Sequence, residues 1–415
     1  MDRKEKTLTI FHLDLDSFYV SAERLRHPLL RNKKVAIGGT GPRSVISSAS
    51  YEARKFGVRS AMPTAQALRL CPELIMVEHD FDYYSQLSCA VFDIVSRYSP
   101  EVDQVSVDEA YIDMTGTESL WGPPETAAKK MRKEIFDKTG LTASVGISPT
   151  RLVSKIASDC CKPNGCLFVR AGQEPKFLAS FEISKIPGCG PVSKEKLNYY
   201  GFYTIADLQK SRPETLKSLL GSMGPYFYYA SFGQEIESDS NTPKSRGISR
   251  ERTYSEDLNK DDAQIKKHLW SLCQELGQEL RENQEQAKSI RLKLRFPPFK
   301  TITRQCTVGT PTALTTEIYR EVIQLFDRFF KSQLTEHKSI RLIGVGCVLA
   351  EKSAQLDLFS DQPYSGASQS GDTKVKQLKL ENLQDTIRAK FGPDALKTGR
   401  DVPANFKQRK ESETP

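Results

Sequence analysis

The sequence predicts a multidomain α+β protein, and three observations lead to that class. The chain has 415 residues, which is too long for one ordinary hydrophobic core. Short apolar, β-branched segments alternate with helical patterns up to about residue 170. A polar segment, SDSNTPKSRG, then separates a helical region from a second group of strand-like runs, so we expect at least one further domain.

The first segments alternate between strand and helix. TLTIFHLDLDS is apolar and β-branched, which predicts a buried strand, and FYVSAERL after it has helical spacing, with Asp16 or Ser17 as its N-cap. VISSASYEARKFGV indicates a strand end, capping serines and a helix, and DYYSQLSCAVFDIVSRYS indicates a longer amphipathic helix. DQVSV and AYIDMT follow each other almost directly, which predicts a hairpin with its turn near residues 107–109.

The remaining elements are expected in two groups. PPETAAKKMRKEIFDKT and PTRLVSKIASDCC predict helices on either side of a strand, TASVGIS, and residues 174–232 predict only short helices separated by glycine. Beyond the polar linker, SIRLKLRF, FKTITRQCTV and SIRLIGVGCVLA predict strands around two helices, near HLWSLCQELGQEL and TEIYREVIQLFDRFF. A last helix is expected near VKQLKLENLQDTIRAKFG.

The composition predicts a water-soluble protein. Hydrophobic residues make up 38% and charged residues 27% of the chain, the mean hydropathy is −0.48, and no apolar run is long enough to span a bilayer. The first residues, MDRKEKTLTIFHLDLD, reach acids before any sustained apolar stretch, which does not support a secretory signal peptide. We therefore expect a cytoplasmic location and no membrane contact. The nine cysteines contain no CxxC pair, so free thiols are expected.

The positive charge is concentrated in one part of the chain. The net charge is +8, and residues 241–350 contain 19 Lys and Arg against 13 Asp and Glu. This segment is the candidate polyanion-binding region.

Four acids indicate a divalent-cation site. Asp14 and Asp16 lie two apart, on one face of a strand if the strand continues that far, and Asp108 and Glu109 lie at the hairpin bend. If a sheet pairs the first strand with the hairpin, these carboxylates converge, and a hard cation such as Mg²⁺ would relieve their repulsion. Two ions roughly 4 Å apart suit in-line phosphoryl transfer. The alternative is that each is an edge or turn acid facing water.

Cations for a phosphate group lie on nearby segments. Tyr51, Arg54 and Lys55 share one face of a predicted helix, and the serines before them could donate from a capping turn. Lys162 precedes Pro163, so its helix must end about there. Solvated surface charges are the alternative.

Six motifs, in order and at suitable spacings, resemble the Y-family DNA polymerases, most closely the bacterial DNA polymerase IV type. The resemblance covers about residues 8–350. The motifs are DLDSFYVSAE from Asp14, YEARKFGVRSAMP from Tyr51, SVDEAYID from Ser106, SVGIS from Ser144, KIASDCCKPNG from Lys155 and IPGCGPVSKEKL from Ile186.

The resemblance implies a role for each candidate residue of the active site. Asp14, Asp108 and Glu109 would be catalytic and hold two Mg²⁺ ions with the carbonyl of Leu15; Asp108 would bridge both ions, Glu109 would serve one, and Asp16 would be structural. Tyr19 matches the steric gate, a ring that would clash with a ribonucleotide 2′-OH. The residues that match triphosphate contacts are Tyr51, Arg54, Lys162 and Ser48, the last of which is threonine in many relatives.

Contacts with DNA are expected in two places. The PGCG turn, with Gly188 and Gly190, resembles a helix-hairpin-helix element whose N–H groups grip a phosphate, and GSMG from Gly221 is a weaker second one. A simple helix stop is the alternative. Arg291, Lys293 and Arg295 alternate with apolar residues, so they share one face of a strand, which is either a phosphate-binding or a merely solvated face.

The run QLDLF resembles the clamp-binding pentapeptide of bacterial polymerases, although a five-residue match can arise by chance. An apolar hook of this kind can dock into a hydrophobic groove of a sliding clamp. It consists of Gln355, Leu356, Asp357, Leu358 and Phe359.

The resemblance implies a right-hand polymerase with the following parts: palm (1–30 and 81–170), fingers (31–80), helical thumb with a helix-hairpin-helix (171–237), linker (238–248), little finger (249–350), and a clamp-binding motif with a largely flexible tail (351–415).

The leading hypothesis is a monomeric, template-directed DNA polymerase that uses primer-template DNA and dNTPs. It would copy damaged DNA with low fidelity and without proofreading, in DNA damage tolerance and repair. A non-catalytic DNA- and clamp-binding relative should lack a metal acid, and all three acids are present. A palm-like nucleotidyl cyclase also uses paired acids and magnesium, but it would leave the helix-hairpin-helix elements and the basic segment without a role.

Overall fold

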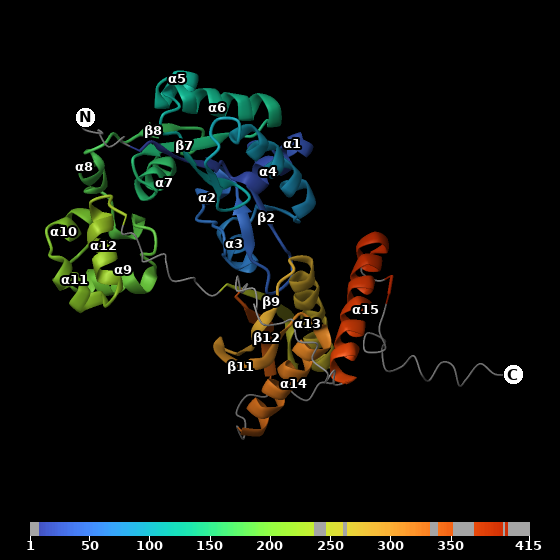
Figure 1. Cartoon of the computed structure of the whole chain (residues 1–415). Coiled ribbons are helices and arrows are strands. Elements are labelled where there is room, and N and C mark those ends of the chain that lie inside the picture. Colours follow the sequence, from blue (N-terminus) through green and yellow to red (C-terminus); the bar gives the residue numbers. More distant parts are fainter. Residues whose placement is uncertain are drawn as a thin grey trace, which may run out of the picture. The chain divides into compact units, whose positions relative to one another are not determined.

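The computed structural model divides into two compact units, Met1–Ser240 and Asn241–Pro415, which are described separately below (Figure 1). Both combine helices with strands, as the predicted α+β class requires. All nine cysteines are free thiols, as expected. No helix among the described residues is long and apolar enough to cross a membrane. The structure describes residues 8–235, 246–259, 264–332, 339–351, 369–392 and 395–396.

The first unit is built around a five-stranded sheet with β1 (Ile10–Leu15) at its centre. β1 is antiparallel to both of its neighbours, β6 (Glu109–Asp113) and β7 (Ala143–Ser148). Its side chains are all buried, and Phe11, Leu13 and Leu15 join the main core, whereas His12 and Asp14 lie on the other face. The strand order is β5 (Val102–Gln104), β6 (Glu109–Asp113), β1 (Ile10–Leu15), β7 (Ala143–Ser148) and β8 (Cys166–Phe168).

Helices cover this sheet and deliver polar residues to the face with His12 and Asp14. α1 (Phe18–Arg26), α4 (Phe81–Val95) and α6 (Pro124–Thr139) bury apolar side chains in the main core, and the short α5 (Glu118–Trp121) precedes α6. α7 (Arg151–Cys160) lies so close to β7 that a Cβ on Gly146 would meet the Ser154 carbonyl oxygen at 1.9 Å. Only glycine permits this approach, which brings α7 against β1.

The connection from β1 to α1 differs from the prediction. The strand ends at Leu15, so Asp16 does not extend the face of Asp14. Ser17, one of the two predicted N-caps, occupies the N-cap position of α1 in a left-handed conformation, with φ 46° and ψ 49°, but its side chain makes no capping hydrogen bond. This sharp turn directs Asp16 to Ser144, whose hydroxyl donates to it over 2.8 Å, and to the N–H of Asn164.

A smaller three-stranded sheet lies between α1 and α4 in the chain, in the order β3 (Ile46–Ala49), β2 (Val35–Gly38) and β4 (Ile75–Val77). It packs with α2 (Tyr51–Arg54) and α3 (Thr64–Leu70) around its own core. Ser50 caps α2 by accepting from the N–H of Ala53, as the serines predicted. The strands β2 and β4 were not predicted from the sequence. A single 3₁₀ turn, Pro28–Leu30, precedes them.

Between β8 and residue 235, the elements of the structure are short helices, as predicted. They share a core with the apolar side of α7. They are α8 (Glu174–Leu178), a 3₁₀ turn (Ile183–Lys185), α9 (Pro191–Tyr199), α10 (Ile205–Gln209), α11 (Pro213–Leu220) and α12 (Met223–Ser231).

The second unit contains a four-stranded antiparallel sheet with two long helices, α13 (Gln264–Glu282) and α14 (Thr315–Ser332), packed into its core. Three of these strands were predicted from the sequence, whereas β9, which begins within the range predicted as the linker, was not. Polar and apolar residues mix along β9, so it lacks a clear strand signal. The order is β11 (Lys300–Thr312), β10 (Ala287–Phe296), β12 (Ser339–Leu349) and β9 (Gly247–Asn259).

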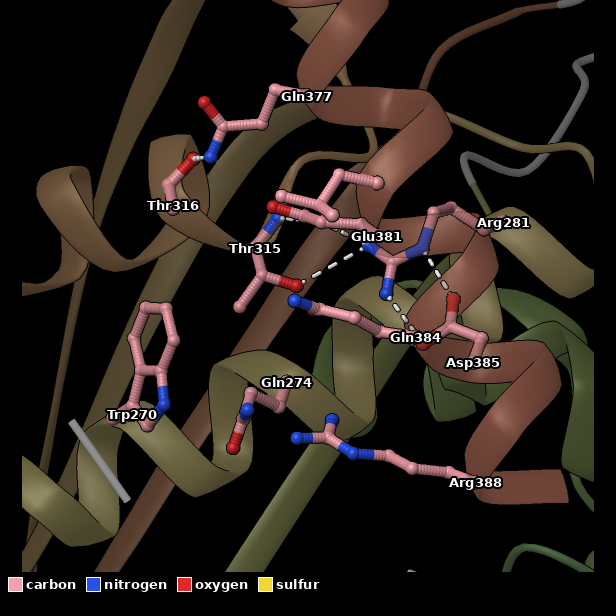
Figure 2. A pocket seen from close by; sticks show the side chains of 11 residues that line it. Trp270, Gln274, Arg281, Thr315, Thr316, Gln377, Glu381, Gln384, Asp385 and Arg388 are labelled. Carbon is pink, nitrogen blue, oxygen red and sulfur yellow. Dashed lines mark hydrogen bonds and ion pairs between the residues drawn. The ribbon is translucent and has the colours of Figure 1, made fainter. Parts of the chain in front are cut away.

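The last predicted helix is present as α15 (Gln369–Phe391), and a group of charges joins it to α13 (Figure 2). Arg281 of α13 donates to Glu381 and Asp385 of α15 over 2.6 and 2.7 Å. It also donates to the Ala313 carbonyl and to Thr315 Oγ1.

Candidate active site

The register between β1 and β6 places Asp14 directly opposite Glu109. Directly opposed residues point to the same face of an antiparallel pair, so the two carboxylates converge although 95 positions separate them in the sequence. The carbonyl of Asp108 accepts from the N–H of Leu15 over 3.0 Å, which ties the bend to the end of β1. The pairing assumed from the sequence is therefore present.

Ser106 shapes the bend that allows two neighbouring acids to serve one site. Its hydroxyl accepts from the N–H groups of Asp108 and Glu109 and donates to Asp108 Oδ1 over 2.6 Å. Asp108 precedes the first residue of β6, so the strict alternation of side chains does not yet apply to it.

One cavity of about 300 Å³ brings together most of the residues predicted for the active site. It contains Asp14 and Asp108 as well as the predicted gate and the predicted triphosphate contacts. Lys55, which shares the helical face of Tyr51, does not line it. The lining residues are Asp14, Leu15, Ser17, Phe18, Tyr19, Ser47, Ser48, Tyr51, Arg54, Ser60, Asp108 and Lys162.

The predicted triphosphate residues come from three elements. Tyr51 and Arg54 lie on α2, and the Arg54 guanidinium sits 4.7 Å from the centre of the Tyr51 ring while its Nε donates to the Ala49 carbonyl. Ser48 is buried on β3. Lys162 follows the end of α7, as predicted, and its Nζ lies 2.6 Å from Asp14 Oδ2.

Tyr19 is held in an aromatic cluster. Its ring stacks on Tyr84 at 4.4 Å, 17° from parallel, and Phe18 and Phe81 pack around it. Because stacking and edge contacts fix the ring, a group entering the cavity beside it would meet a rigid wall.

The acids have strongly perturbed pKa values. Burial raises the pKa of Asp14 to about 7; Lys162 opposes this shift, and the charges of Glu109 and Asp108 add to it. The ammonium of Lys155, 2.8 Å from Glu109 Oε2, holds the pKa of Glu109 well below its usual range. Perturbation of this size beside a cavity is typical of functional sites.

The donor set fits a hard divalent cation in its chemistry. All three acids offer oxygen ligands, as Mg²⁺ prefers, and a cation would offset the cost of burying Asp14. In the part of the chain that the structure describes, however, no three His, Cys, Asp or Glu side chains are arranged to hold an ion as they stand. Asp14 is turned to Lys162, Glu109 to Lys155 and Asp108 to Ser106, so binding requires these side chains to turn.

The polar partners of Glu109 were not among the residues predicted from the sequence. His12 and Lys155 contact this carboxylate, and Ser158 contacts His12. His12 stands two residues before Asp14, on the same face of β1, and this spacing could have identified it.

The predicted DNA contacts lie in the helical region and in the second unit. Gly188 has φ +85°, and the turn is held by Tyr226, whose hydroxyl donates to the Pro187 carbonyl. The N–H of Gly190 is directed to the Gly188 carbonyl within the turn. The second glycine turn joins α11 to α12, and Gly224 lies against the Leu216 carbonyl, where a Cβ would be 2.2 Å away.

The basic side chains of β10 share one face, as predicted. Residues 290, 292, 294 and 296 are buried, whereas Arg291, Lys293 and Arg295 are not. Each has a local partner: Arg291 donates to Gln305, Lys293 to Glu251 and Arg295 to Thr301. The QLDLF motif, residues 355–359, lies outside the described residues.

Comparison with known proteins identifies relatives of the whole chain. The model of the impB/mucB/samB family matches residues 13–159, and the model of its C-terminal domain matches residues 245–358. A protein named DNA polymerase IV from Dehalococcoides mccartyi is 34% identical over 94% of this chain and 97% of its own length. Proteins of the same name from Treponema denticola (35%, 94% and 96%) and Caulobacter vibrioides (34%, 95% and 94%) are equally similar.

The fold has a solved counterpart. A chimera of Y-family DNA polymerases superimposes with a TM-score of 0.72 at 22% identity, over 82% of this chain and 98% of its own. The resemblance inferred from six motifs is thereby confirmed, and this chain belongs to the Y family of DNA polymerases, as a DNA-directed DNA polymerase of the DNA polymerase IV type.

Proposed function

We propose that the chain adds dNTPs to a primer 3′-hydroxyl by two-metal phosphoryl transfer, with Asp14, Asp108, Glu109 and the Leu15 carbonyl holding two Mg²⁺ ions. The observation that carries this proposal is the β1–β6 register, which sets Asp14 opposite Glu109 beside a cavity that also contains Arg54 and Lys162. When bound, the ions would activate the hydroxyl and stabilise the charge on the leaving phosphate.

The cations of the cavity would bind the triphosphate. Arg54 offers a planar fork at the exposed end of α2, and Lys162 would exchange the Asp14 carboxylate for a phosphate oxygen. The hydroxyls of Ser48 and Tyr51 line the same cavity and can donate to the same group. Tyr19, fixed by Tyr84, would lie beneath the sugar and exclude a 2′-hydroxyl.

DNA would be gripped outside this cavity. Gly188 would present its backbone N–H to a phosphate, and Gly190 would do so after releasing the Gly188 carbonyl. Arg291, Lys293 and Arg295 would exchange their local partners for the DNA backbone. The domain boundaries given above are part of this proposal. The affinity for DNA should then fall steeply with salt, because each phosphate contact releases counterions.

The proposed biological role is synthesis across damaged templates in the cytoplasm, by a monomer without proofreading that is tethered to the sliding clamp through QLDLF. The name of the relatives and the separate C-terminal unit support this role, since a second DNA-gripping unit suits an enzyme that must hold an irregular template.

A primer-extension assay with purified chain, Mg²⁺ and dNTPs tests the proposal. We expect addition of the complementary nucleotide, extension past an abasic site, and no shortening of a mismatched primer end when dNTPs are withheld. No extension on an undamaged template would contradict the polymerase mechanism, and shortening of the primer would contradict the absence of proofreading. Deletion of residues 355–359 should abolish stimulation by the clamp and spare unassisted extension.

A further inference from the structure

A series of polar contacts connected to Glu109 has no role in the function proposed above. It joins His12 on β1 to Lys155 and Ser158 on α7. His12 is completely buried, and burying an imidazole costs free energy unless its ring nitrogens are hydrogen-bonded. The contacts of this ring therefore need an explanation.

The contacts lead from Ser158 on α7 to His12, then to Lys155, and from Lys155 to the carboxylate of Glu109. The Ser158 hydroxyl donates to the Lys155 carbonyl over 2.8 Å, and His12 Nδ1 lies 2.7 Å from the same Ser158 Oγ. On the other side of the ring, Nε2 lies 3.4 Å from Lys155 Nζ, and this ammonium donates to Glu109 Oε2 over 2.8 Å.

One tautomer of His12 satisfies all of these partners. An ammonium group has only donors, so Nε2 accepts from Lys155 when it carries no proton. With the Ser158 hydrogen on the Lys155 carbonyl, Oγ accepts and Nδ1 donates. In this tautomer, His12 holds the Lys155 ammonium at one point.

The arrangement restricts the Glu109 carboxylate. The long side chain of Lys155 is 30% exposed, and an isolated ion pair of this kind would leave both side chains free to rotate. With Nζ also held by His12, the ammonium occupies Oε2 and leaves Oε1 for a cation. The 3.8 Å between His12 Nε2 and Glu109 Oε2 is too long for a hydrogen bond, so His12 acts on the acid through Lys155.

We propose that Lys155, held by His12 and Ser158, is a positioning residue that orients Glu109 for the one cation this acid holds. The inference rests on the proposed function, because it concerns the assignment of Glu109 as a metal ligand. It gives α7 a role in the chemistry: its close packing on β7 at Gly146 sets the point from which Lys155 reaches the acid.

The first test separates the rate of the chemical step from nucleotide binding. Lys155→Met keeps the apolar stem and removes the ammonium, and we expect kcat for single-nucleotide addition to fall about 10- to 100-fold, the usual effect of losing a partner of a metal ligand. The KM for dNTP should stay within about twofold, because Lys155 does not line the nucleotide cavity. Lys155→Arg, which keeps a cationic donor, should recover most of the rate.

A metal-binding readout excludes general damage to the site. Binding of Mn²⁺ to the enzyme with primer-template, followed by electron paramagnetic resonance, should be unchanged or tighter in Lys155→Met, since a positive charge near the site is lost. The matched control is Lys133→Met, which removes an exposed lysine paired with Asp137 on α6 and should change neither quantity. An unchanged kcat in Lys155→Met, or a joint loss of rate and Mn²⁺ affinity, would overturn the proposal.

The tautomer provides a test without metal or turnover. In ¹⁵N-histidine-labelled protein, which contains five histidines, His12 should show the neutral Nδ1–H tautomer, and Lys155→Met should shift its Nε2 resonance. A protonated ring or an Nε2–H tautomer would contradict the arrangement. If Asp108→Ala extends primers as well as wild type, the two-metal assignment fails; if that variant is inactive and Lys155→Met is unaffected, only the positioning role fails.

Discussion

Each unit contains a group of poorly exposed charged side chains, and the two groups differ in how completely they are paired. In the first unit, Asp14 and Glu109 each pair with one lysine and Asp108 with Ser106, beside a cavity of about 300 Å³. In the second, Arg281 stands beside a slightly larger cavity of about 350 Å³. The size of the cavity therefore does not tell which group binds a ligand.

The pairing of each group is more informative. Arg281 uses Nε, Nη1 and Nη2 on Asp385, Glu381, Ala313 and Thr315, so its donors are taken within the unit (Figure 2). In the acidic site, burial raises the pKa of Asp14 to about 7, and Asp108 is hydrogen-bonded to the Ser106 hydroxyl. A group whose donors are all used stabilises the fold, whereas a buried carboxylate with a raised pKa beside a cavity is typical of a functional site.

The largest expected effect is on catalysis. Asp108→Ala should lower kcat at least about 10³-fold, because the proposed bridging ligand of both ions is lost. Steady-state primer extension measures it, and the melting temperature should not fall, because a like charge is removed from the group. The matched control is Asp103→Ala, an exposed acid on β5 paired with Arg151. Equal losses of kcat in the two variants would mean that Asp108 has no catalytic role that another acid of this hairpin lacks.

The second effect should fall on stability alone. Arg281→Met leaves Glu381 and Asp385 buried without their partner, which costs roughly 3–5 kcal/mol of stability. Amide exchange of α15 should become much faster while single-nucleotide addition stays unchanged. The control is Arg320→Met, which removes an exposed ion pair with Glu321 and should change neither the stability nor the amide exchange of α15. Loss of activity in Arg281→Met with α15 still protected would show that the Arg281 group is functional after all.

The third effect concerns selectivity. Tyr19→Ala should reduce the preference for dNTP over rNTP about 10²-fold, because the ring fixed against Tyr84 no longer excludes the 2′-hydroxyl. Competition between dCTP and CTP opposite a template guanine measures it. Unchanged selectivity would remove the gate assignment, and Tyr83→Ala, a neighbouring ring outside the cavity lining, serves as control.

The smallest effect is a dependence of stability on pH. The pKa of Asp14 is raised from 3.8 to about 7 in the folded protein. The stability that this residue contributes is therefore fully present below pH 3.8 and is lost as the pH rises through about 7. Asp14→Asn should therefore be more stable than wild type at pH 8.5, by about 1–2 kcal/mol, and close to it at pH 4.5. Chemical denaturation without divalent cations measures the difference. If the difference in stability between Asp14→Asn and wild type does not vary with pH, burial does not raise the pKa of Asp14.

The sequence determined the elements that have a strong local signal. The buried run around Asp14, the hairpin at Asp108 and the serine cap of α2 follow from side-chain pattern and turn chemistry over a few residues. Six spaced motifs also identified the family. β9 was missed because polar and apolar residues mix along it, and its place is set by pairing with β12 rather than by its own pattern.

Only the tertiary structure decided how distant residues meet. The register that sets Asp14 opposite Glu109, the left-handed Ser17 that turns Asp16 away, and the contact of Lys155 with His12 depend on strands and helices far apart in the chain. Local pattern gives the type of an element and the face of each side chain, whereas register and helix packing arise from the whole core. The acids were therefore visible in the sequence, and the partners that orient them were not.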